Sequence, residues 1–237
     1  MVSTIENHHP DKLNHPDFTV PTERKVHQKI HSTEPNDSPI SINYRQYHKI
    51  TLILAGMRNY SIGFEKDFDI KPKLDLSFFE IQKRTIAYKL HSLLSKELKI
   101  IDIKGFGPTN LACILTFAHP NKFPSLRKYL FYCGYTSRNK LTVNYCHRIK
   151  PTMYLILDGI MRKKDPKYYP IYIKIKNEWL AKFEDENFVK SFQEAHSKSK
   201  IYKKFPKKLI ADGLARNRVS TLILKEVYSK LHEVESV

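Results

Sequence analysis

The stretch IKGFGPTNLA, residues 103–112, places two of the chain's seven glycines directly before an apolar run. Gly105 and Gly107 permit backbone angles that a β-carbon closes, so a tight turn can form here and its amides can converge. Pro108 suits the first turn of the helix that follows, because its missing N–H has no partner to lose there. Unpaired N–H groups at such a helix start attract anions, so the stretch predicts a phosphate-binding turn.

The same residues match the signature of a helix-hairpin-helix, with Ala112 five positions after the second glycine. We expect Phe106 to point into the helical pair and Ala112 to let the two helices approach closely. Such a turn contacts the phosphate backbone through peptide N–H groups and reads no base edges, which predicts binding without sequence preference. The alternative is a joint between two helices that binds nothing.

The 55 residues from Ile103 to Leu157 contain no aspartate or glutamate. At the chain's average content about six would be expected, and a charge run of this kind is informative. A folded domain tolerates such self-repulsion when a polyanion neutralises it, and the alternative is a solvated face balanced by acids from elsewhere. The gap also disfavours the helix-hairpin-helix DNA glycosylases, which need a catalytic aspartate after the hairpin.

Composition points to the same partner. The formal net charge is +17, which is more than solubility requires and favours nucleic acid, DNA rather than RNA. The residues expected to contact it are the turn and the nearby cations: Lys104, Gly105, Phe106, Gly107, Thr109, Asn110, Arg127, Lys128, Arg138, Lys140, Arg148, Lys150 and Arg162.

No cofactor and no metal site are expected. Cys133, Cys146 and His147 lack the paired spacing of a structural zinc site. The longest apolar runs are too short to cross a bilayer, and no signal-peptide pattern opens the chain, which predicts a cytoplasmic protein with reduced, buried cysteines.

Helical periodicity dominates the rest of the chain, so the predicted fold class is mainly α. Residues 1–40 hold five prolines and five histidines and predict a flexible arm. Residues 41–74 predict a helical N-terminal segment, with a helix to Tyr60 and a break over 63–73. Residues 75–237 predict a helical nucleic-acid-binding domain. Its further helices are expected after Ser125, from Pro151, over 169–183 and, as one or two helices, over 209–234.

A long helix over 77–98 opens that domain. It carries an apolar stripe at helical period: Phe79, Ile81, Ile86, Leu90, Leu93, Leu94 and Leu98. The stripe packs against the core or pairs with a second copy of the chain, so a homo-oligomer through this helix is a possible assembly.

The order of these parts resembles a known family. LKIIDIKGFGPTNLACILTF, FPSLRKYLFYCGY and KKLIADGLARNRVSTLIL are similar, in matching order, to the C-terminal domain of Piv-type DNA invertases and of transposases of the insertion sequence "one-ten" family. The similarity covers residues 75 to about 232. It implies a transposase-like role, in which an N-terminal RNase H-like domain with four acidic metal ligands acts with a C-terminal serine that attacks DNA.

This chain departs from that family in two places. Residues 1–74 contain no β-rich segment with an aspartate in an apolar strand, so the metal-binding half is not expected. The loop after Gly134 lacks the family's Ser-Gly-Gly run, and Ser137 is the residue that would stand for the nucleophile. We therefore expect a DNA-binding protein whose catalysis requires a partner. The rival hypotheses are an active recombinase that uses Ser137 and a helical scaffold.

Overall fold

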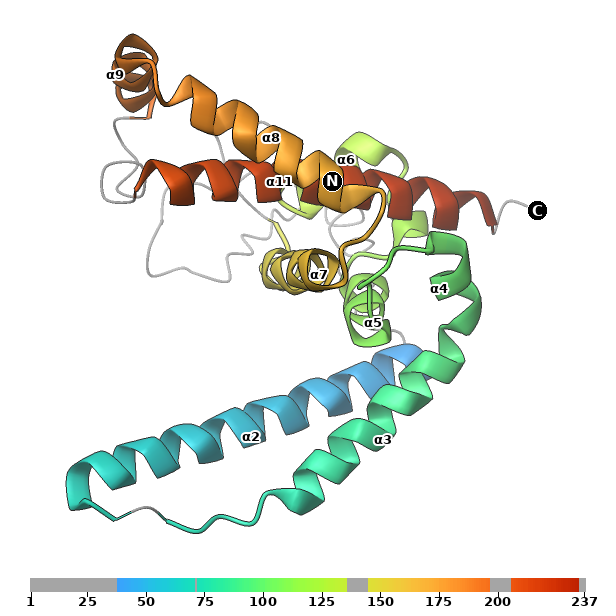
Figure 1. Cartoon of the computed structure of the whole chain (residues 1–237). Helices are drawn as coiled ribbons and strands as arrows, with labels where there is room; N and C mark the ends of the chain where they lie inside the picture. The colour runs from blue at the N-terminus through green and yellow to red at the C-terminus, as the bar shows by residue number, and fades with distance from the viewer. Residues whose placement is uncertain (1–37, 71, 136–144, 197–205, 235–237) are drawn as a thin grey trace, which may run out of the picture.

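The structure is a computed structural model that describes residues 38–70, 72–135, 145–196 and 206–234. The fold is mainly α, as the sequence predicts, and these ranges contain no strand. The predicted arm, residues 1–40, lies almost entirely outside the described residues. Figure 1 shows a helical body from which one pair of helices projects.

The helices follow one another with short connections. They are α2 (Pro39–Phe68), α3 (Ser77–Leu93), α4 (Ser95–Ile101), α5 (Pro108–Phe117), the 3-10 turn η1 (Pro120–Lys122), α6 (Leu126–Tyr132), α7 (Ile149–Lys163), α8 (Tyr168–Lys182), α9 (Glu186–Ala195) and α11 (Lys207–Val234).

Local sequence signals explain several helix ends. The side chain of Ser125 accepts a hydrogen bond from the Lys128 N–H and so caps the start of α6. Gly134, with φ +80°, follows the end of α6 in the left-handed region, as a glycine after a helix end predicts. Lys164 takes a left-handed conformation and ends α7, whose last turn carries Arg162 and Lys163 beside the free carbonyl groups.

Three boundaries differ from the prediction. Gly63 lies inside α2, which continues to Phe68 and ends at Asp69 in a left-handed conformation, so the break is shorter than predicted. The single helix over 77–98 is wrong, because the helix is interrupted at Leu94. Leu90, Leu94 and Ile101 are all fully buried, and the bend lets both α3 and α4 contribute to one core. The last segment is one helix, α11, which continues through Gly213.

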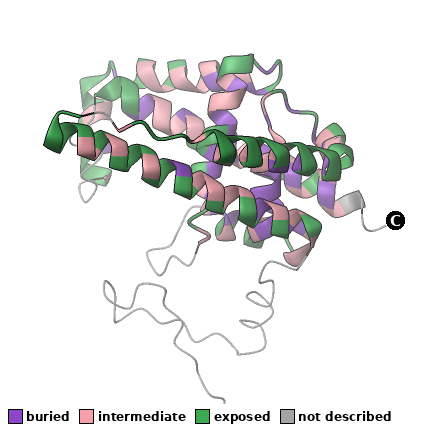
Figure 2. Ribbon diagram, turned by 90° about the horizontal axis from the view of Figure 1, so that it is seen from below, coloured by how far each residue is buried: buried purple, intermediate pink, exposed green. Residues whose placement is uncertain are grey.

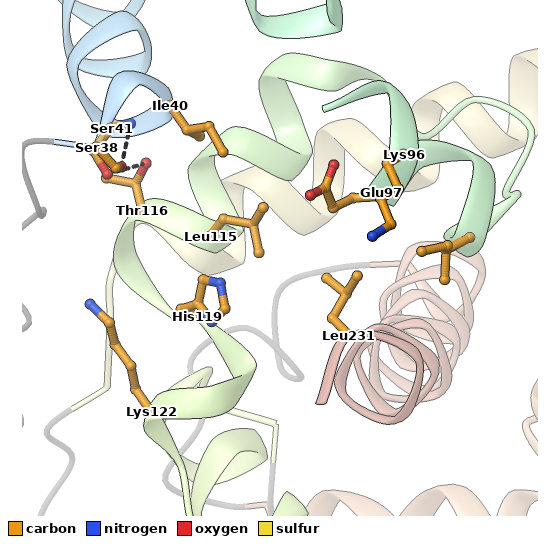
Figure 3. A pocket seen from close by; sticks show the side chains of 11 residues that line it. Ser38, Ile40, Ser41, Lys96, Glu97, Leu115, Thr116, His119, Lys122 and Leu231 are labelled. Atoms are coloured by element: carbon orange, nitrogen blue, oxygen red, sulfur yellow. Dashed lines mark hydrogen bonds between the residues drawn. The ribbon is translucent and has the colours of Figure 1, made fainter. Parts of the chain in front are cut away.

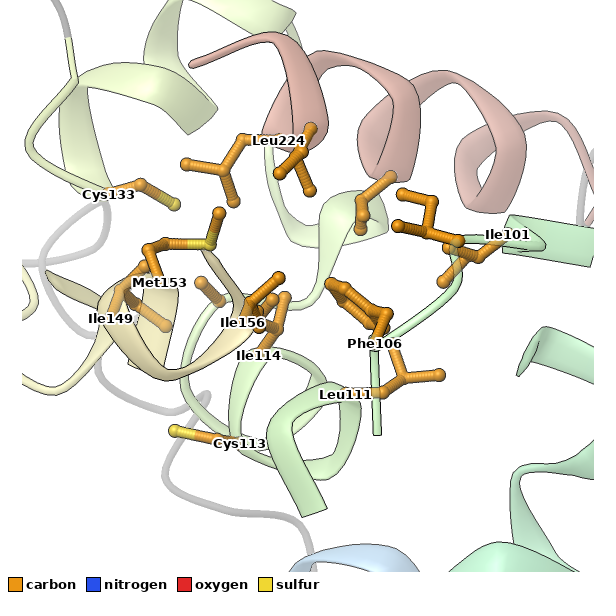
Figure 4. Packing of buried hydrophobic residues seen from close by; sticks show 14 of the residues in the cluster. Ile101, Phe106, Leu111, Cys113, Ile114, Cys133, Ile149, Met153, Ile156 and Leu224 are labelled. Atoms are coloured by element: carbon orange, nitrogen blue, oxygen red, sulfur yellow. The ribbon is translucent and has the colours of Figure 1, made fainter. Parts of the chain in front are cut away.

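The core forms around α5, α7 and α11. α5 is buried along most of its length, and the buried face of α7 packs against it. α11 lies across α8, α6 and the end of α4 and closes the other side. Figure 4 shows Phe106, Ile114, Ile156 and Leu224 meeting in this core. A smaller aromatic cluster joins α8, α9 and the start of α11.

The pair α2 and α3 extends away from the body (Figure 1). α2 buries only Ser41, Tyr44 and Leu54, and the pair is largely exposed in Figure 2. Twelve of the sixteen large hydrophobic side chains that the described residues leave exposed lie between Ile42 and Leu93. In the described ranges, no helix combines the length and the apolar character needed to cross a bilayer.

Candidate nucleic-acid interface

The predicted hairpin turn lies between α4 and α5, and its first glycine is packed against a second glycine on α7. Gly105 has φ +100°, a conformation that residues with a β-carbon rarely adopt. A β-carbon at Gly105 would lie 2.5 Å from the carbonyl carbon of Gly159. A β-carbon at Gly159 would lie 2.4 Å from the carbonyl oxygen of Gly105. Backbone therefore meets backbone here, which only two glycines permit.

The second glycine of the motif has a different role from the first. Gly107 precedes α5 with φ −82° and ψ 160°, an extended conformation open to any residue. Space for a β-carbon is open at this position. The expectation that both glycines supply special backbone angles is wrong for Gly107. The expected burial of Phe106 and Ala112 is confirmed, because both side chains are buried in the core.

A buried carboxylate from the start of α8 supports the turn. Oδ2 of Asp165 accepts a hydrogen bond of 2.8 Å from the Lys104 N–H. Oδ1 of the same side chain accepts hydrogen bonds from the N–H groups of Lys167 (3.0 Å) and Tyr168 (2.8 Å). Asp165 is 2% exposed, so this charge is satisfied by three peptide donors. Sequence analysis missed it, although an aspartate just before a helix is a common capping signal.

Two peptide donors remain at the start of α5. The Gly107 carbonyl accepts from Asn110 and Leu111 and begins the helix. The N–H groups of Gly107 and Thr109 have no acceptor within the described part of the chain. Both residues are partly exposed, and the positive end of the α5 dipole adds to their field. These N–H groups, rather than that of Lys104, are available to an anion.

The predicted contact residues fall at two ends of one helical pair. Gly105 meets Gly159 near the end of α7, whereas Arg148, before the start of α7, lies over the ring of Phe117 at the end of α5, 4.6 Å from its centroid. α5 and α7 therefore run antiparallel. The ten residues of α5 span about 15 Å. The sequence-predicted site is thus divided rather than continuous.

The first group contains the turn and the end of α7. It comprises Lys104, Gly105, Phe106, Gly107, Thr109, Asn110 and Arg162, of which Phe106 is buried and cannot contact a ligand. Lys104 and Arg162 are exposed. The Nε atom of Arg162 donates to the Asp158 carbonyl, which leaves the guanidinium at the protein surface.

The second group surrounds α6 and the start of α7. Arg127 and Lys128 are exposed on α6, and Arg148 is exposed above Phe117. Lys150 lies over the ring of Tyr145, with Nζ 5.1 Å from the ring centroid. The end of α6 adjoins these residues, because the Cys146 N–H donates to the Tyr132 carbonyl.

Charge is separated between the two halves of the body. Toward the C-terminus, cations pair with carboxylates: Lys167 and Lys230 with Glu226, Lys176 with Asp212, and Arg216 with Asp158 and Asp212. In the acid-free stretch, five cations form no ion pair with any described residue: Lys104, Lys122, Arg127, Lys128 and Arg148. Their charge is therefore left for an external anion.

Some predicted residues are not placed. Ser137, Arg138 and Lys140 lie outside the described residues. Cys113 and Cys133 are buried, as predicted, and burial raises the pKa of both thiols, which keeps them protonated. Among the described side chains, no group of three or more His, Cys, Asp or Glu residues is arranged to hold a metal ion.

Comparisons of the chain with protein-family models, with curated proteins and with solved structures find no match. The function must therefore be argued from the interface itself.

Proposed function

We propose that this protein binds DNA through its phosphate backbone with little sequence preference, as a transposase-like C-terminal domain that depends on a partner for catalysis. The observation that carries the proposal is the separation of charge. Five unpaired cations belong to a stretch without a single carboxylate, while the cations of α8 and α11 are neutralised within the protein.

The geometry supports two phosphate contacts on one strand or duplex. The Gly107 and Thr109 N–H groups and Lys104 form the first, and Arg127, Lys128 and Arg148 form the second. A duplex carries one charge per about 1.7 Å of axis, so a spacing of about 15 Å covers several phosphates. Backbone contacts of this kind position a protein and read no base edge, which explains the expected lack of sequence preference. The similarity to the "one-ten" transposases adds the expectation of DNA rather than RNA.

A salt titration tests the proposal. We expect the logarithm of the affinity for duplex, single-stranded and branched DNA to fall linearly with the logarithm of salt concentration, with a slope of about −0.9 per phosphate contact on a duplex. RNA of matched structure should bind more weakly. The proposal fails if none of the DNA forms binds at about 50 mM salt, a concentration at which backbone contacts are strong.

A charge-matched pair of variants locates the interface. The double variant Arg127→Gln, Lys128→Gln should bind DNA more weakly and lower the magnitude of the salt slope by about 2. The control Lys182→Gln, Lys190→Gln removes two exposed cations from α8 and α9, near several acids, and should leave the slope unchanged. Equal losses in both double variants would mean that net charge alone attracts DNA.

A scaffold role is the second candidate function. The exposed apolar side chains of α2 and α3 favour it, because contiguous exposed apolar surface is typical of protein interfaces. The two functions are compatible, since the exposed helix pair and the basic stretch belong to different parts of the fold.

A further inference from the structure

A pocket of about 350 Å³ opens between the start of α2, α4, the end of α5 with η1, and the end of α11 (Figure 3). Ligand pockets have volumes of roughly 300–1,000 Å³, so this one suits a small group such as a single nucleobase. Its walls come from segments as far apart in sequence as Ser38 and Leu231. None of the predicted contact residues except the nearby cation stretch around Lys122 reaches it.

The walls combine apolar surface with one aromatic ring. Ile40, Leu115 and Leu231 supply the apolar part, and the imidazole of His119 lies beside them (Figure 3). Nδ1 of His119 accepts from the Asn121 N–H, which fixes the ring position. Apolar and aromatic side chains are what proteins place against the faces of an unstacked base.

The pocket also holds a carboxylate oxygen with no hydrogen bond. Oε2 of Glu97 is buried and has no partner among the described residues. A buried acceptor without a donor loses its hydration and gains nothing in return. The carboxylate extends from α4 toward Leu115 and Ile40 in Figure 3. Rotation about its last torsion, which is soft, would turn this oxygen toward a donor in the pocket.

Two lysines give the same pocket an anion-binding rim. Lys96 and Lys122 both line it. Partial burial lowers the pKa of Lys122, so a nearby anion would stabilise its charged form. The pocket therefore offers one acceptor for N–H groups, two cations for an anion, and apolar faces between them.

We propose that this pocket binds the unpaired guanine of a single-stranded DNA segment, with the Glu97 carboxylate accepting from the guanine N–H groups and Lys96 and Lys122 contacting its phosphate. Guanine presents two adjacent donors, N1–H and the N2 amino group, which match the two oxygens of a carboxylate. Adenine and cytosine place an acceptor beside their amino group, and thymine flanks its N–H with two carbonyl oxygens. The inference rests on the proposed DNA binding and adds a base preference at one position.

The test compares thymidine 12-mers that carry one central guanine, adenine, cytosine or hypoxanthine, by fluorescence anisotropy with the full chain. The guanine oligomer should bind on the order of tenfold more tightly than the thymidine oligomer. Hypoxanthine, which lacks the amino group, should fall between them. Equal affinities for guanine and thymidine would overturn the pocket assignment and leave backbone binding intact. Absence of binding to every oligomer would instead overturn the proposed function.

Two variants separate the pocket from general affinity. Glu97→Gln should remove the guanine preference and keep the affinity for the thymidine oligomer, because the amide offers only one acceptor. Glu178→Gln, an exposed acid on α8, is the matched control and should keep the preference. A guanine preference that survives in Glu97→Gln contradicts the assignment.

Free nucleotide distinguishes the pocket from its presentation in a strand. Guanosine monophosphate should raise the thermal midpoint of the wild-type protein, whereas thymidine monophosphate should not, and neither should raise that of Glu97→Gln. The same melting curves confirm that the variant folds. Stabilisation by the free nucleotide with no binding to any oligomer would assign the pocket to a nucleotide ligand and overturn the DNA-strand part of the proposal.

Discussion

Gly105 and Gly159 are in backbone contact, although 54 positions separate them in the sequence. The contact joins the turn before α5 to the last part of α7 and brings the two helices together at that end. The turn before α5 therefore owes its position to α7 as much as to its own motif. This relationship makes the two glycines the most sensitive positions of the interface.

Substitution of either glycine by alanine should destabilise the protein. At Gly159 the new methyl group would press on the Gly105 carbonyl, and overpacking of this kind costs about 1–3 kcal/mol. At Gly105 the positive φ adds about 1–2 kcal/mol to the clash. For a chain of this size each kcal/mol lowers the thermal midpoint by about 2–4 °C, which calorimetry can measure.

Gly213→Ala is the control for both substitutions. Gly213 lies inside α11, and a β-carbon there would meet no atom within 4 Å. Alanine should therefore stabilise the helix by about 0.5–1 kcal/mol. A Gly105→Ala variant that melts at or above the wild-type midpoint would contradict the packing described for the turn.

Asp165 should be needed for the position of the turn. Replacing it with alanine leaves the N–H groups of Lys104, Lys167 and Tyr168 without their acceptor. Each buried donor left unsatisfied costs about 1–3 kcal/mol, so the variant should be strongly destabilised in chemical denaturation. Asp165→Asn keeps one acceptor oxygen and should lose less. If both variants unfold at the wild-type denaturant concentration, the carboxylate does not hold the turn.

The free energy of unfolding should fall in acid through Glu226. Partial burial opposes ionisation of this carboxyl group, but hydrogen bonds from Lys167, Lys230 and Tyr168 outweigh it and lower its pKa to about 2. The folded pKa lies below the unfolded value near 4.5, so the stabilisation is present above pH 4.5 and is lost as the pH falls toward 2. Hydrogen bonds to a charged group contribute about 1.5–3 kcal/mol in total at such a site.

The variant Glu226→Gln isolates this effect. Its stability relative to wild type, measured by denaturation at pH 7 and at pH 3, should differ less at pH 3, because the wild-type carboxyl has then begun to lose its advantage. Glu184→Gln, an exposed acid beyond the end of α8, gives the background for carboxylates in general. A constant difference between wild type and Glu226→Gln across this range would exclude the linkage.

The sequence predicts the helical fold class because its signals are local. Ser125 and Gly134 mark the ends of α6 through contacts within a few residues. The interruption at Leu94 has no such signal, because it arises from the burial of Leu90 and Ile101 in a shared core. Tertiary burial decides the helix direction there, against a continuous helical period.

The candidate site follows the same division. The glycine turn and the acid-free stretch could be found in the sequence, since both are runs of neighbouring residues. The Asp165 contact with the turn joins positions 61 apart, and the pocket around Glu97 draws its walls from both ends of the described chain. A single sequence carries no measure of such pairings, so the separation of the cations into two groups could not be predicted either.

Self-association through α2 and α3 is the last prediction. Ile62 and Ile81 are 65% and 61% exposed, and burial of such a side chain in an interface stabilises it by about 1.5–3 kcal/mol. We expect the wild-type chain to sediment at twice its monomer mass at micromolar concentration. The double variant Ile62→Gln, Ile81→Gln should raise the dissociation constant at least tenfold, since 1.4 kcal/mol is a factor of ten. Leu209→Gln, which changes an exposed side chain on α11, should leave it unchanged. A wild-type monomer at all concentrations up to about 100 μM, where a dissociation constant corresponds to only about 5.5 kcal/mol, would exclude the assembly and leave the exposed pair to another partner.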